Sequence, residues 1–559
     1  MSNIMKKIDE MTKEELVVLV KEVKKRKKYG LVWEDKPEDV VEQCKKELPI
    51  LEEVTDKKIN LNNALQTNLL IEGDNFHALS VLNYTHTGKV DVIYIDPPYN
   101  TGAKDWKYNN DFVDINDTYR HSKWISMMNN RLSLAKRLLS PDGVLICAID
   151  DNEHAHLGTL LEEVFPNKEI HWITVIHNPG GIQGKNFSYT HEYAIFVIPK
   201  GKKIVNLQDR TDNPDVRPLR DVSTGDHLRT DAKNCFYPIY VKDNTVVGFG
   251  EVCPDSFHPS SANILRKDGI LEIYPIDAKG NERKWVFARQ TVEEIKNELN
   301  VVFNKQRKIH DIIRTKSKFN YKTVWTDGRY NANAYGTKIL RKILPNCNFD
   351  FPKSIYTVYD CISAIVANKK DAIVLDYFAG SGTTGHAVLM LNKLDEGNRK
   401  FILCTNNENG IAEDVCYPRI KKIIDGVAEL PDITGFSANL RYFKTAFVSK
   451  SKVSDDTRRE LVKKSTEMIC VRENTFEKIE DNTSFKIYRD SNHVTGVLFD
   501  LDSLDSFKKR LQELNLSANI YVFSLTNDTF NDDFDDLRLE HELCPIPESI
   551  LEVYRKLFK

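Results

Sequence analysis

The 559-residue sequence lacks any apolar run that approaches the ~20 residues needed to span a bilayer. Its first residues, Met1–Lys6, are polar and lack the apolar core of a signal peptide. The ten cysteines are scattered without a CxxC spacing, which argues against a zinc site and against a disulfide framework. We therefore expect no membrane segment, no bound metal, reduced cysteines and a cytoplasmic location.

The sequence also lacks a basic excess, since its formal net charge is −3. Proteins that bind nucleic acid usually carry a basic footprint, but a total charge hides how the charges are distributed. The acidic run at 531–536 can offset a basic groove elsewhere. Candidates for such a groove are Lys24–Lys28 and Lys305–Lys322, although we interpret Lys24–Lys28 as a solvated helix face.

A short apolar run, Val92–Ile95, ends abruptly at Asp96-Pro97-Pro98-Tyr99. The run predicts a buried strand, and the prolines predict a rigid turn at its carboxyl end, where open α/β sheets bind ligands. A carboxylate and a neighbouring carbonyl can accept both hydrogens of an exocyclic amine, while an aromatic ring stacks on the base that carries it. The motif alone leaves open a simpler interpretation, in which Asp96 is an ordinary strand-end cap.

A second motif, Asp376–Thr384, follows the apolar segment 372–375 and opens a predicted helix at 383–394. Strand, glycine turn and helix start are typical of a nucleotide-binding loop, although a tight turn without a ligand stays possible. Gly380, Gly382 and Gly385 also match GxGxxG, the dinucleotide pattern. An NAD-dependent oxidoreductase needs an acid at the end of the next strand, and Glu408 comes late for that role.

Together the two motifs, in this order, resemble the β-class DNA amino-methyltransferases that use S-adenosylmethionine. The resemblance extends over about 30–450 and is strongest to the modification subunits of Type III restriction-modification systems. It also rests on further segments, which are Glu72–Asn75, His121–Leu139, Gly143–Ile146, Asp150–Glu153, Phe351–Ser354, Tyr417–Ile420 and Leu440–Thr445.

The resemblance assigns roles to individual residues. The catalytic residues it implies are Asp96, Pro97, Pro98 and Tyr99. The residues it implies for S-adenosylmethionine are Asp74, Lys353, Asp376, Phe378, Gly380, Gly382, Thr383 and Thr384. Many relatives hold the cofactor ribose with an acid after the strand at 401–404. Here Thr405-Asn406-Asn407 stands at that place, so Asn407 and Glu408 are only weak substitutes.

The implied reaction is methylation of a base flipped out of double-stranded DNA, because the amine of a stacked base is out of reach. Aspartate at position 96 favours adenine N6, with cytosine N4 as the alternative. The implied partners are a second copy of the chain and a helicase-nuclease restriction subunit. An amino-methyltransferase of proteins or small molecules, or a non-catalytic scaffold, stays a separate hypothesis.

Alternating strands and helices predict an α/β fold with a doubly wound, mostly parallel sheet. We divide the chain into a helical N-terminal segment (1–55), a catalytic half (56–200), a target-recognition domain (201–344), a cofactor half (345–430) and a C-terminal α/β module (431–559). The insertion is too long for a simple loop.

Two features of the chain are predicted to face DNA. The glycine-rich stretch 178–185 is a candidate flap beside the flipped base. Cations in the insertion can contact phosphates or, less often, base edges. The candidates are Arg217, Arg220, Arg229, Arg283, Lys284 and Arg289.

Overall fold

A computed structural model describes residues 11–17, 31–62, 65–347, 349–426, 435–450, 454–524 and 530–558. Two compact units form: Met1–Asn206 together with Lys322–Lys559, and Leu207–Tyr321. The cationic run Lys24–Lys28 lies outside the described residues. Within those ranges, no helix combines the length and the apolar character needed to cross a membrane.

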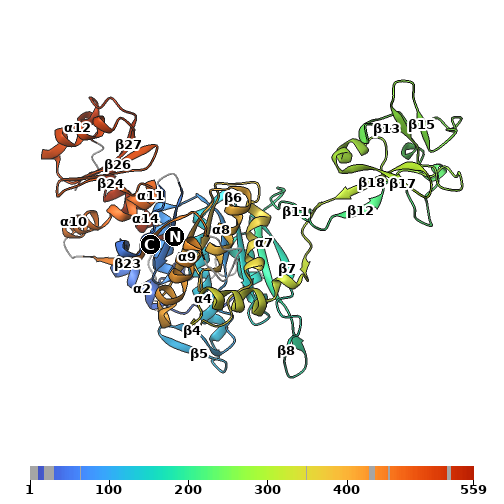
Figure 1. The fold of residues 1–559 in the computed structure, drawn as a ribbon. Helices are drawn as coiled ribbons and strands as arrows, with labels where there is room; N and C mark the ends of the chain where they lie inside the picture. Colours follow the sequence, from blue (N-terminus) through green and yellow to red (C-terminus); the bar gives the residue numbers. More distant parts are fainter. Residues whose placement is uncertain are drawn as a thin grey trace. The chain divides into compact units, whose positions relative to one another are not determined.

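The first unit is built on one large mixed sheet (Figure 1). Its strands, in spatial order, are β1 (Glu47–Glu53), β23 (Asn439–Ser449), β2 (Thr67–Glu72), β22 (Lys400–Thr405), β21 (Ile373–Asp376), β3 (Val90–Ile95), β6 (Leu139–Ile149), β10 (Glu192–Pro199), β7 (Lys168–Val175) and β20 (Val324–Trp325). Every pairing from β23 to β6 is parallel, whereas β1 and β10 pair antiparallel with their neighbours. The predicted doubly wound, mostly parallel sheet is confirmed.

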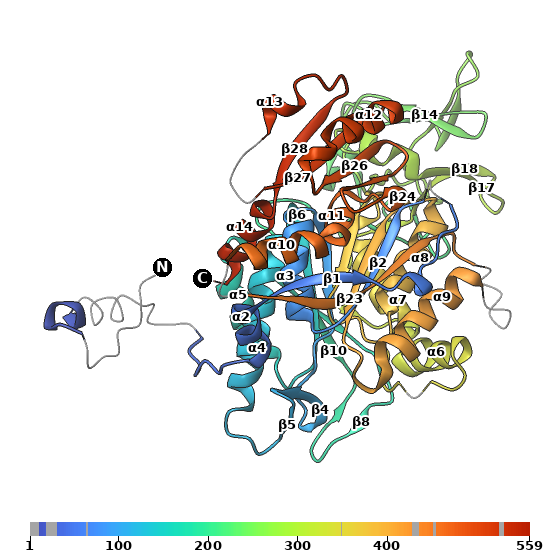
Figure 2. The same ribbon diagram turned by 90° about the vertical axis from the view of Figure 1, so that its left-hand side faces the viewer.

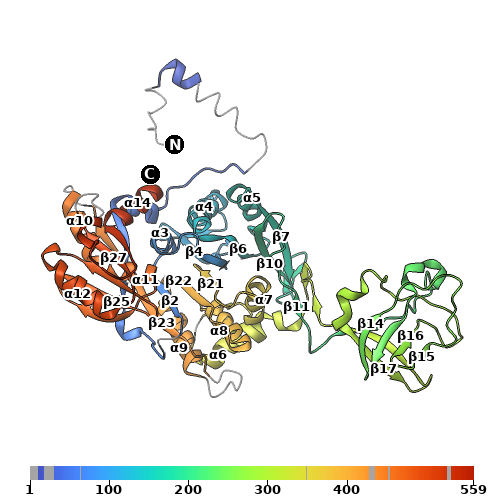
Figure 3. The ribbon, with the colours of Figure 1, turned by 90° about the horizontal axis from the view of Figure 1, so that it is seen from above.

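Helices cover both faces of this sheet, as the view in Figure 3 shows. One face carries α3 (Asn75–Thr85), α4 (Arg120–Leu138) and α5 (His154–Val164), and the other carries α7 (Ile355–Val366), α8 (Thr383–Asp395) and α9 (Tyr417–Asp425). All six residues of β3 are buried, which explains why a strand covered on both sides is a continuous apolar run.

Strands β1 and β23, which are far apart in the sequence, lie side by side at one lateral edge of the sheet (Figure 2), and this differs from the predicted segment boundaries. The predicted helical segment 1–55 contains α2 (Asp39–Lys46), but also β1, which pairs with β23. The boundary at 431 would place β23 in the C-terminal module, yet β23 is a strand of the main sheet. An edge strand tolerates Pro49, and this proline together with flanking charges hides β1 in the sequence.

The second unit, Leu207–Tyr321, lies inside the predicted range 201–344 and is built from antiparallel strands. One sheet contains β12 (Asp215–Pro218), β18 (Ile309–Lys316) and β17 (Leu299–Asn304). The other contains β14 (Thr245–Phe249), β13 (Ile239–Lys242), β16 (Leu271–Ile273) and β15 (Asn263–Leu265). The unit has its own apolar core, which includes Tyr237, Trp285 and Ile312.

A smaller sheet forms near the C-terminus. Its strands are β24 (Glu477–Asp481), β25 (Phe485–Arg489), β26 (His493–Leu498), β27 (Ser517–Phe523) and β28 (His541–Ile546). Helix α12 (Leu504–Leu514) packs on this sheet, and its buried Phe507 and Leu511 join the core of the sheet.

Candidate active site

The two sequence motifs lie next to each other where the central parallel strands of the main sheet end. We call this side of the sheet its carboxyl edge. Strands β3 and β21 are parallel partners, with Val92 opposite Val374. The chain therefore leaves both strands at the same edge, at Asp96 and at Asp376. Strand β10 runs antiparallel to β6, so it begins at this edge, and its first residue is Glu192.

Four side chains meet at this edge and form what we call the acceptor corner: Asp96, Tyr99, Glu192 and Lys353. The Lys353 ammonium donates to Glu192 Oε2 and to the Tyr99 hydroxyl oxygen, and lies 3.4 Å from Asp96 Oδ1. The Tyr99 hydroxyl donates to Glu192 Oε2 over 3.0 Å. The Lys353 nitrogen also lies 4.6 Å from the centre of the Tyr99 ring. A single cation thus contacts both carboxylates and the aromatic ring.

Burial and charge act in opposite directions on the groups of the acceptor corner. Burial raises the pKa of the Asp96 carboxyl, and the nearby Lys353 ammonium only partly opposes this. Burial also acts to raise the pKa of Glu192, but there the Lys353 ammonium prevails and the pKa is lowered. Burial acts to lower the pKa of Lys353, but the two carboxylates prevail and raise it. Lys353 and Glu192 therefore form a charged pair, and the interaction of Lys353 with Asp96 is the weaker of the two.

The glycine loop is fixed by hydrogen bonds made by its own residues. Asp376 accepts from the Thr384 hydroxyl at 2.5 Å and from the Phe378 backbone N–H at 2.9 Å. Burial raises the pKa of Asp376 to about 7. The Thr383 hydroxyl accepts from the buried Arg419 guanidinium at 2.8 Å. Both threonine hydroxyls therefore have partners inside the protein, and they shape the turn.

Two glycines give this loop its path. Gly380 and Gly382 have φ values of 48° and 77°, in the left-handed region that residues with a Cβ rarely adopt. The turn they form brings the backbone to the start of α8, whose first amide groups lack partners within the helix. The side chain of Phe378 is partly buried beside them.

Asp74 lies at the end of β2, on the same edge, and caps α3 by accepting from the Phe76 N–H at 2.7 Å. Its side chain is 32% exposed and lies 3.4 Å from the Arg131 guanidinium. The adjacent Asn75 donates to the Tyr377 carbonyl at 3.0 Å, which ties this segment to the glycine loop. Asp74 therefore belongs to the same edge as the two main motifs.

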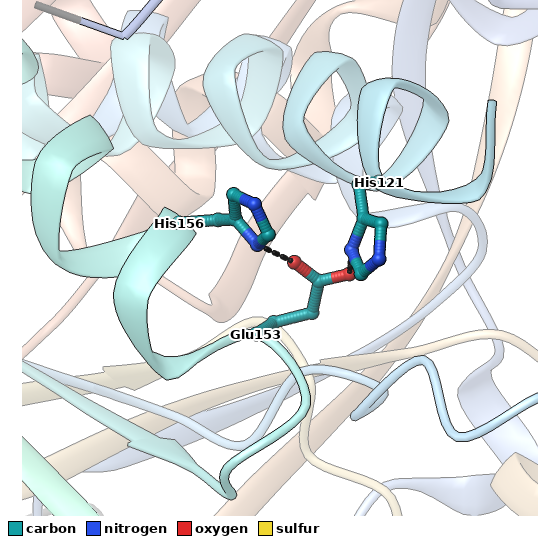
Figure 4. Close-up of side chains that lie close together, drawn as sticks. All are labelled: His121, Glu153 and His156. Atoms are coloured by element: carbon teal, nitrogen blue, oxygen red, sulfur yellow. Dashed lines mark hydrogen bonds and ion pairs between the residues drawn. The ribbon is translucent and has the colours of Figure 1, made fainter. Parts of the chain in front are cut away.

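A second cluster supports the segment that follows Tyr99, and we call it the Glu153 hub (Figure 4). Glu153 is fully buried; its Oε1 accepts from the Asn100 side-chain amide and bonds His121 Nδ1 at 2.6 Å. Its Oε2 lies 2.9 Å from His156 Nδ1. Trp106 donates to Asn100 Oδ1, and Asn100 has a φ of 57°. The hub therefore fixes Asn100, the residue that directly follows the motif Asp96–Tyr99.

The residue types of the hub can also ligate a metal, since the ligand atoms of His121, Glu153 and His156 lie within 4.8 Å of one another. However, Arg120 donates to His121 Nε2 at 3.1 Å, which leaves the His121 proton on Nδ1, the atom that faces Glu153. A metal ion needs that nitrogen without its proton. The arrangement is thus better suited to sharing protons than to binding a metal.

Most of the residues implied for catalysis and cofactor binding lie along one sheet edge. Lys353 was predicted for the cofactor, but its contacts are with Asp96, Tyr99 and Glu192. The two weak candidates for the ribose contact have other partners: Asn407 bonds residues of the following turn, and Glu408 pairs with Lys107 at 2.6 Å. Sequence reasoning missed Glu192, although an acid at the start of a buried apolar strand was a usable signal.

The cations predicted for DNA contact in the second unit differ strongly in exposure. The Arg229 guanidinium is enclosed and donates to three backbone carbonyls and to Glu282. Four others have partners within the unit, namely Arg220 with Asp311, Lys284 with Asp221, Arg283 with Asp277 and Arg289 with the Gly250 carbonyl. The Arg217 side chain is 77% exposed on β12, beside Asp215.

Comparisons with known proteins agree with the motifs. The chain is 32% identical over 380 residues to the Type II methyltransferase M.KpnI of Klebsiella pneumoniae, which covers 65% of this chain and 84% of that protein. It is 31% identical over 395 residues to the Mod subunit of the Type III restriction-modification enzyme EcoPI of Escherichia phage P1, covering 62% of this chain and 58% of that subunit. The chain thus spans little more than half the length of that subunit.

A crystal structure of an M1.HpyAVI–SAM complex has a TM-score of 0.30 and 13% identity, and the match covers 63% of this chain and 100% of that chain. Residues 90–413, more than half of the sequence, match the family model described as DNA methylase. The protein therefore belongs to the DNA methylase family whose model covers the N6 and N4 methyltransferases.

Proposed function

We propose that this protein transfers a methyl group from S-adenosylmethionine to N6 of an adenine flipped out of double-stranded DNA. The observation that carries the proposal is the pairing of β3 with β21. The segment Asp96–Tyr99 and the glycine loop follow the carboxyl ends of these neighbouring strands, which supports a transfer between groups bound at the two segments.

The acceptor side of the site supplies positioning and charge. The Asp96 carboxylate and the Pro97 carbonyl accept the two hydrogens of the target amine, and this directs the nitrogen lone pair toward the methyl group. Tyr99 stacks on the flipped base and offsets part of the few kcal/mol that flipping costs. Fixed geometry and preorganised charge then provide most of the rate enhancement.

Asp74 and the glycine loop, on the other side of β3 from Glu192, suit the chemical groups of the methyl donor. S-adenosylmethionine carries a sulfonium, an ammonium and a carboxylate, and when bound it supplies an already electrophilic methyl group. Asp74 offers a partly exposed carboxylate for the positive groups. The amides at the start of α8 suit a negative group, and the turn at Gly380 and Gly382 lets a ligand approach the backbone.

Two further features support DNA as the substrate. The stretch 178–185, predicted as a flap, contains the first strand of a short hairpin, β8 (Ile182–Gln183) with β9 (Ser188–Tyr189), which lies in the chain between β7 and β10. It presents Ile182, Phe187 and Tyr189, which are 61%, 78% and 52% exposed. The unit Leu207–Tyr321 is inserted at the position of the predicted target-recognition domain. We propose that both contact the duplex.

The similarity to a Type III Mod subunit supports a role in a Type III-like restriction-modification system. In that role the protein acts on double-stranded DNA as a homodimer, together with a helicase-nuclease restriction subunit. Copurification of the full chain with such a subunit from the same genome tests this part of the proposal.

Nucleoside mass spectrometry of DNA from cells that express the chain tests the reaction itself. We expect N6-methyladenine in cells with the wild-type protein and none with Asp96→Ala. N4-methylcytosine in its place assigns the activity to cytosine, and methyl incorporation into protein but not DNA contradicts the proposal. Single-molecule sequencing of the same DNA gives the recognition site.

A further inference from the structure

A lysine ammonium occupies the place where the proposed reaction needs an amine. The amine of the flipped base must donate hydrogens to Asp96 and lie beside the Tyr99 ring. The nitrogen of Lys353 lies 3.4 Å from Asp96 Oδ1 and 4.6 Å from the centre of that ring. The ammonium and the exocyclic amine are both nitrogen donors, so they compete for the same acceptors.

The contacts of Lys353 are uneven, and this decides which of them yields first. Its nitrogen makes a direct hydrogen bond to Glu192, whereas Asp96 is farther away. Glu192 and Lys353 are only 6% and 12% exposed, but the Asp96 side chain is 28% exposed. The ammonium is therefore anchored at Glu192, and Asp96 is the partner that can release it to an incoming group.

We propose that Lys353 is a placeholder for the target amine: it occupies the amine position between Asp96 and Tyr99 while no base is bound, and Glu192 keeps the ammonium when the flipped base enters. This inference rests on the proposed function. It makes Glu192 and Lys353 positioning residues on the acceptor side of the site.

The local fold limits this exchange to side-chain movement. Lys353 directly precedes Ser354, the N-cap residue of α7. The backbone there packs closely against Gly336, where a Cβ would lie 2.2 Å from the Pro352 carbonyl oxygen. The backbone of Lys353 is therefore fixed by a close contact. Its long side chain has several rotatable bonds and can withdraw from Asp96 while it stays within reach of Glu192.

The charges around Asp96 make the proposal testable by pH. The groups that act on Asp96 are Lys353, Glu192, Tyr99, Tyr94 and Asp376. His177 lies 3.8 Å from Glu192, and Asp150 and Cys361 are further titratable groups that interact with Lys353 or with the pair. Lys353→Met leaves the Glu192 charge unbalanced and raises the pKa of Asp96. Glu192→Gln removes a negative charge, lowers that pKa, and transfers the ammonium to Asp96.

The experiment measures methyl transfer by the full-length protein to unmodified genomic DNA between pH 5 and 9. For Lys353→Met we expect the acidic limb of kcat/KM to move up by about one pH unit. For Glu192→Gln we expect the limb to move down and KM for DNA to rise about tenfold, the factor equivalent to one pKa unit of interaction. Neither variant should change the Kd for S-adenosylmethionine, and Lys338→Met, an exposed lysine on α6 (Lys338–Ile343), is the matched control.

The double variant Lys353→Met/Glu192→Gln separates this role from a structural one, because it leaves no unpaired buried charge. We expect it to return the acidic limb to the wild-type position and to bring KM for DNA back below that of Glu192→Gln. The inference fails if both single variants lower the rate at every pH without moving the limb, or if the double variant keeps the raised KM. If the wild-type protein methylates no DNA, the proposed function fails instead.

Discussion

Two buried glutamates contact the Asp96–Asn100 segment, and their surroundings shift the pKa values of their carboxyls in opposite directions. Glu192 lies beside the Lys353 ammonium, and the pKa of its carboxyl is lowered. Glu153 lies among an amide and two histidines, and burial raises its pKa to about 7. Both residues are nearly or fully buried. The difference in pKa therefore comes from their neighbours, because only Glu192 has a cation in direct contact.

The acceptor corner is a region whose contacts can be exchanged for contacts with a substrate, whereas the Glu153 hub supports the backbone. In the acceptor corner one ammonium is shared by two carboxylates and a tyrosine, so a competing amine can take over some of its contacts. In the Glu153 hub a buried carboxylate bonds the Asn100 amide and His121, and these contacts hold Asn100 in the left-handed region. Substitutions should therefore change the reaction in the first region and the fold in the second.

The largest effect is expected for Asp96→Ala, on the exchange side of the comparison. Loss of the acceptor for the target amine should lower single-turnover methyl transfer by roughly 10³-fold or more, as removal of a preorganised polar group does in other enzymes. Binding of S-adenosylmethionine, measured by calorimetry, should largely survive. Asp142→Ala is the control, since Asp142 is 61% exposed and pairs with the exposed Lys202. A near wild-type rate for Asp96→Ala contradicts its assigned role.

The next effect is expected for Glu153→Ala, on the supporting side. The Asn100 amide and the His121 N–H would lose their shared acceptor, and buried unpaired donors cost about 1–3 kcal/mol each. We expect a loss of about 3 kcal/mol in the free energy of unfolding by urea, with the rate falling because Asn100 is no longer held. An unchanged stability with a lost activity would instead place Glu153 in the reaction.

The pH dependence of Glu153→Gln tests whether the two glutamates differ in this way. An acid whose pKa is raised from 4.5 to about 7 by folding stabilises the protein fully below pH 4.5 and loses that contribution as pH rises through about 7. Glutamine resembles the protonated acid, because its oxygen can accept from Asn100 and His121 while its amide faces His156. It cannot ionise.

The melting temperature of Glu153→Gln relative to wild type should therefore rise between pH 5 and pH 8, by about 1 °C for each kcal/mol recovered in a unit of this size. Differential scanning calorimetry at the two pH values measures this. The control is Glu192→Gln, for which no such rise is expected, since the pKa of Glu192 is lowered by its ion pair and its carboxylate stays ionised between pH 5 and pH 8. Equal shifts for both variants would remove the distinction between the two glutamates.

The parts of this site that could be predicted from sequence are the ones set by local patterns. Strands β3 and β21 are short apolar runs that end in proline or glycine turns, and α4 and α8 have apolar residues at helical spacing. Parallel strands then place their carboxyl ends at one edge without further information. The positions of Asp96 and Asp376 follow from this reasoning.

The parts that could not be predicted depend on pairs that are distant in sequence. Glu192 acquires its role from Lys353, 161 residues away, and Glu153 from Asn100, 53 residues away. Strand β1 is recognisable only through its pairing with β23 near the other end of the chain. No local pattern encodes such pairs. The exposure of individual arginines in the second unit depends on the same kind of long-range contact.

The smallest effect is expected for two arginines of the second unit, Leu207–Tyr321. The Arg229 guanidinium donates its hydrogen bonds to backbone carbonyls and to Glu282, whereas the Arg217 side chain is 77% exposed and has Asp215 beside it. If this unit contacts DNA, Arg217→Ala should weaken DNA binding several-fold and reduce the slope of log K against log salt by about one. The melting temperature of Arg217→Ala should equal that of the wild type. Arg229→Ala should lower the melting temperature, because buried carbonyls then lack a donor, and it should leave the salt slope unchanged. Fluorescence anisotropy at several salt concentrations measures the slope, and an Arg217→Ala slope equal to wild type would remove this residue from the proposed DNA interface.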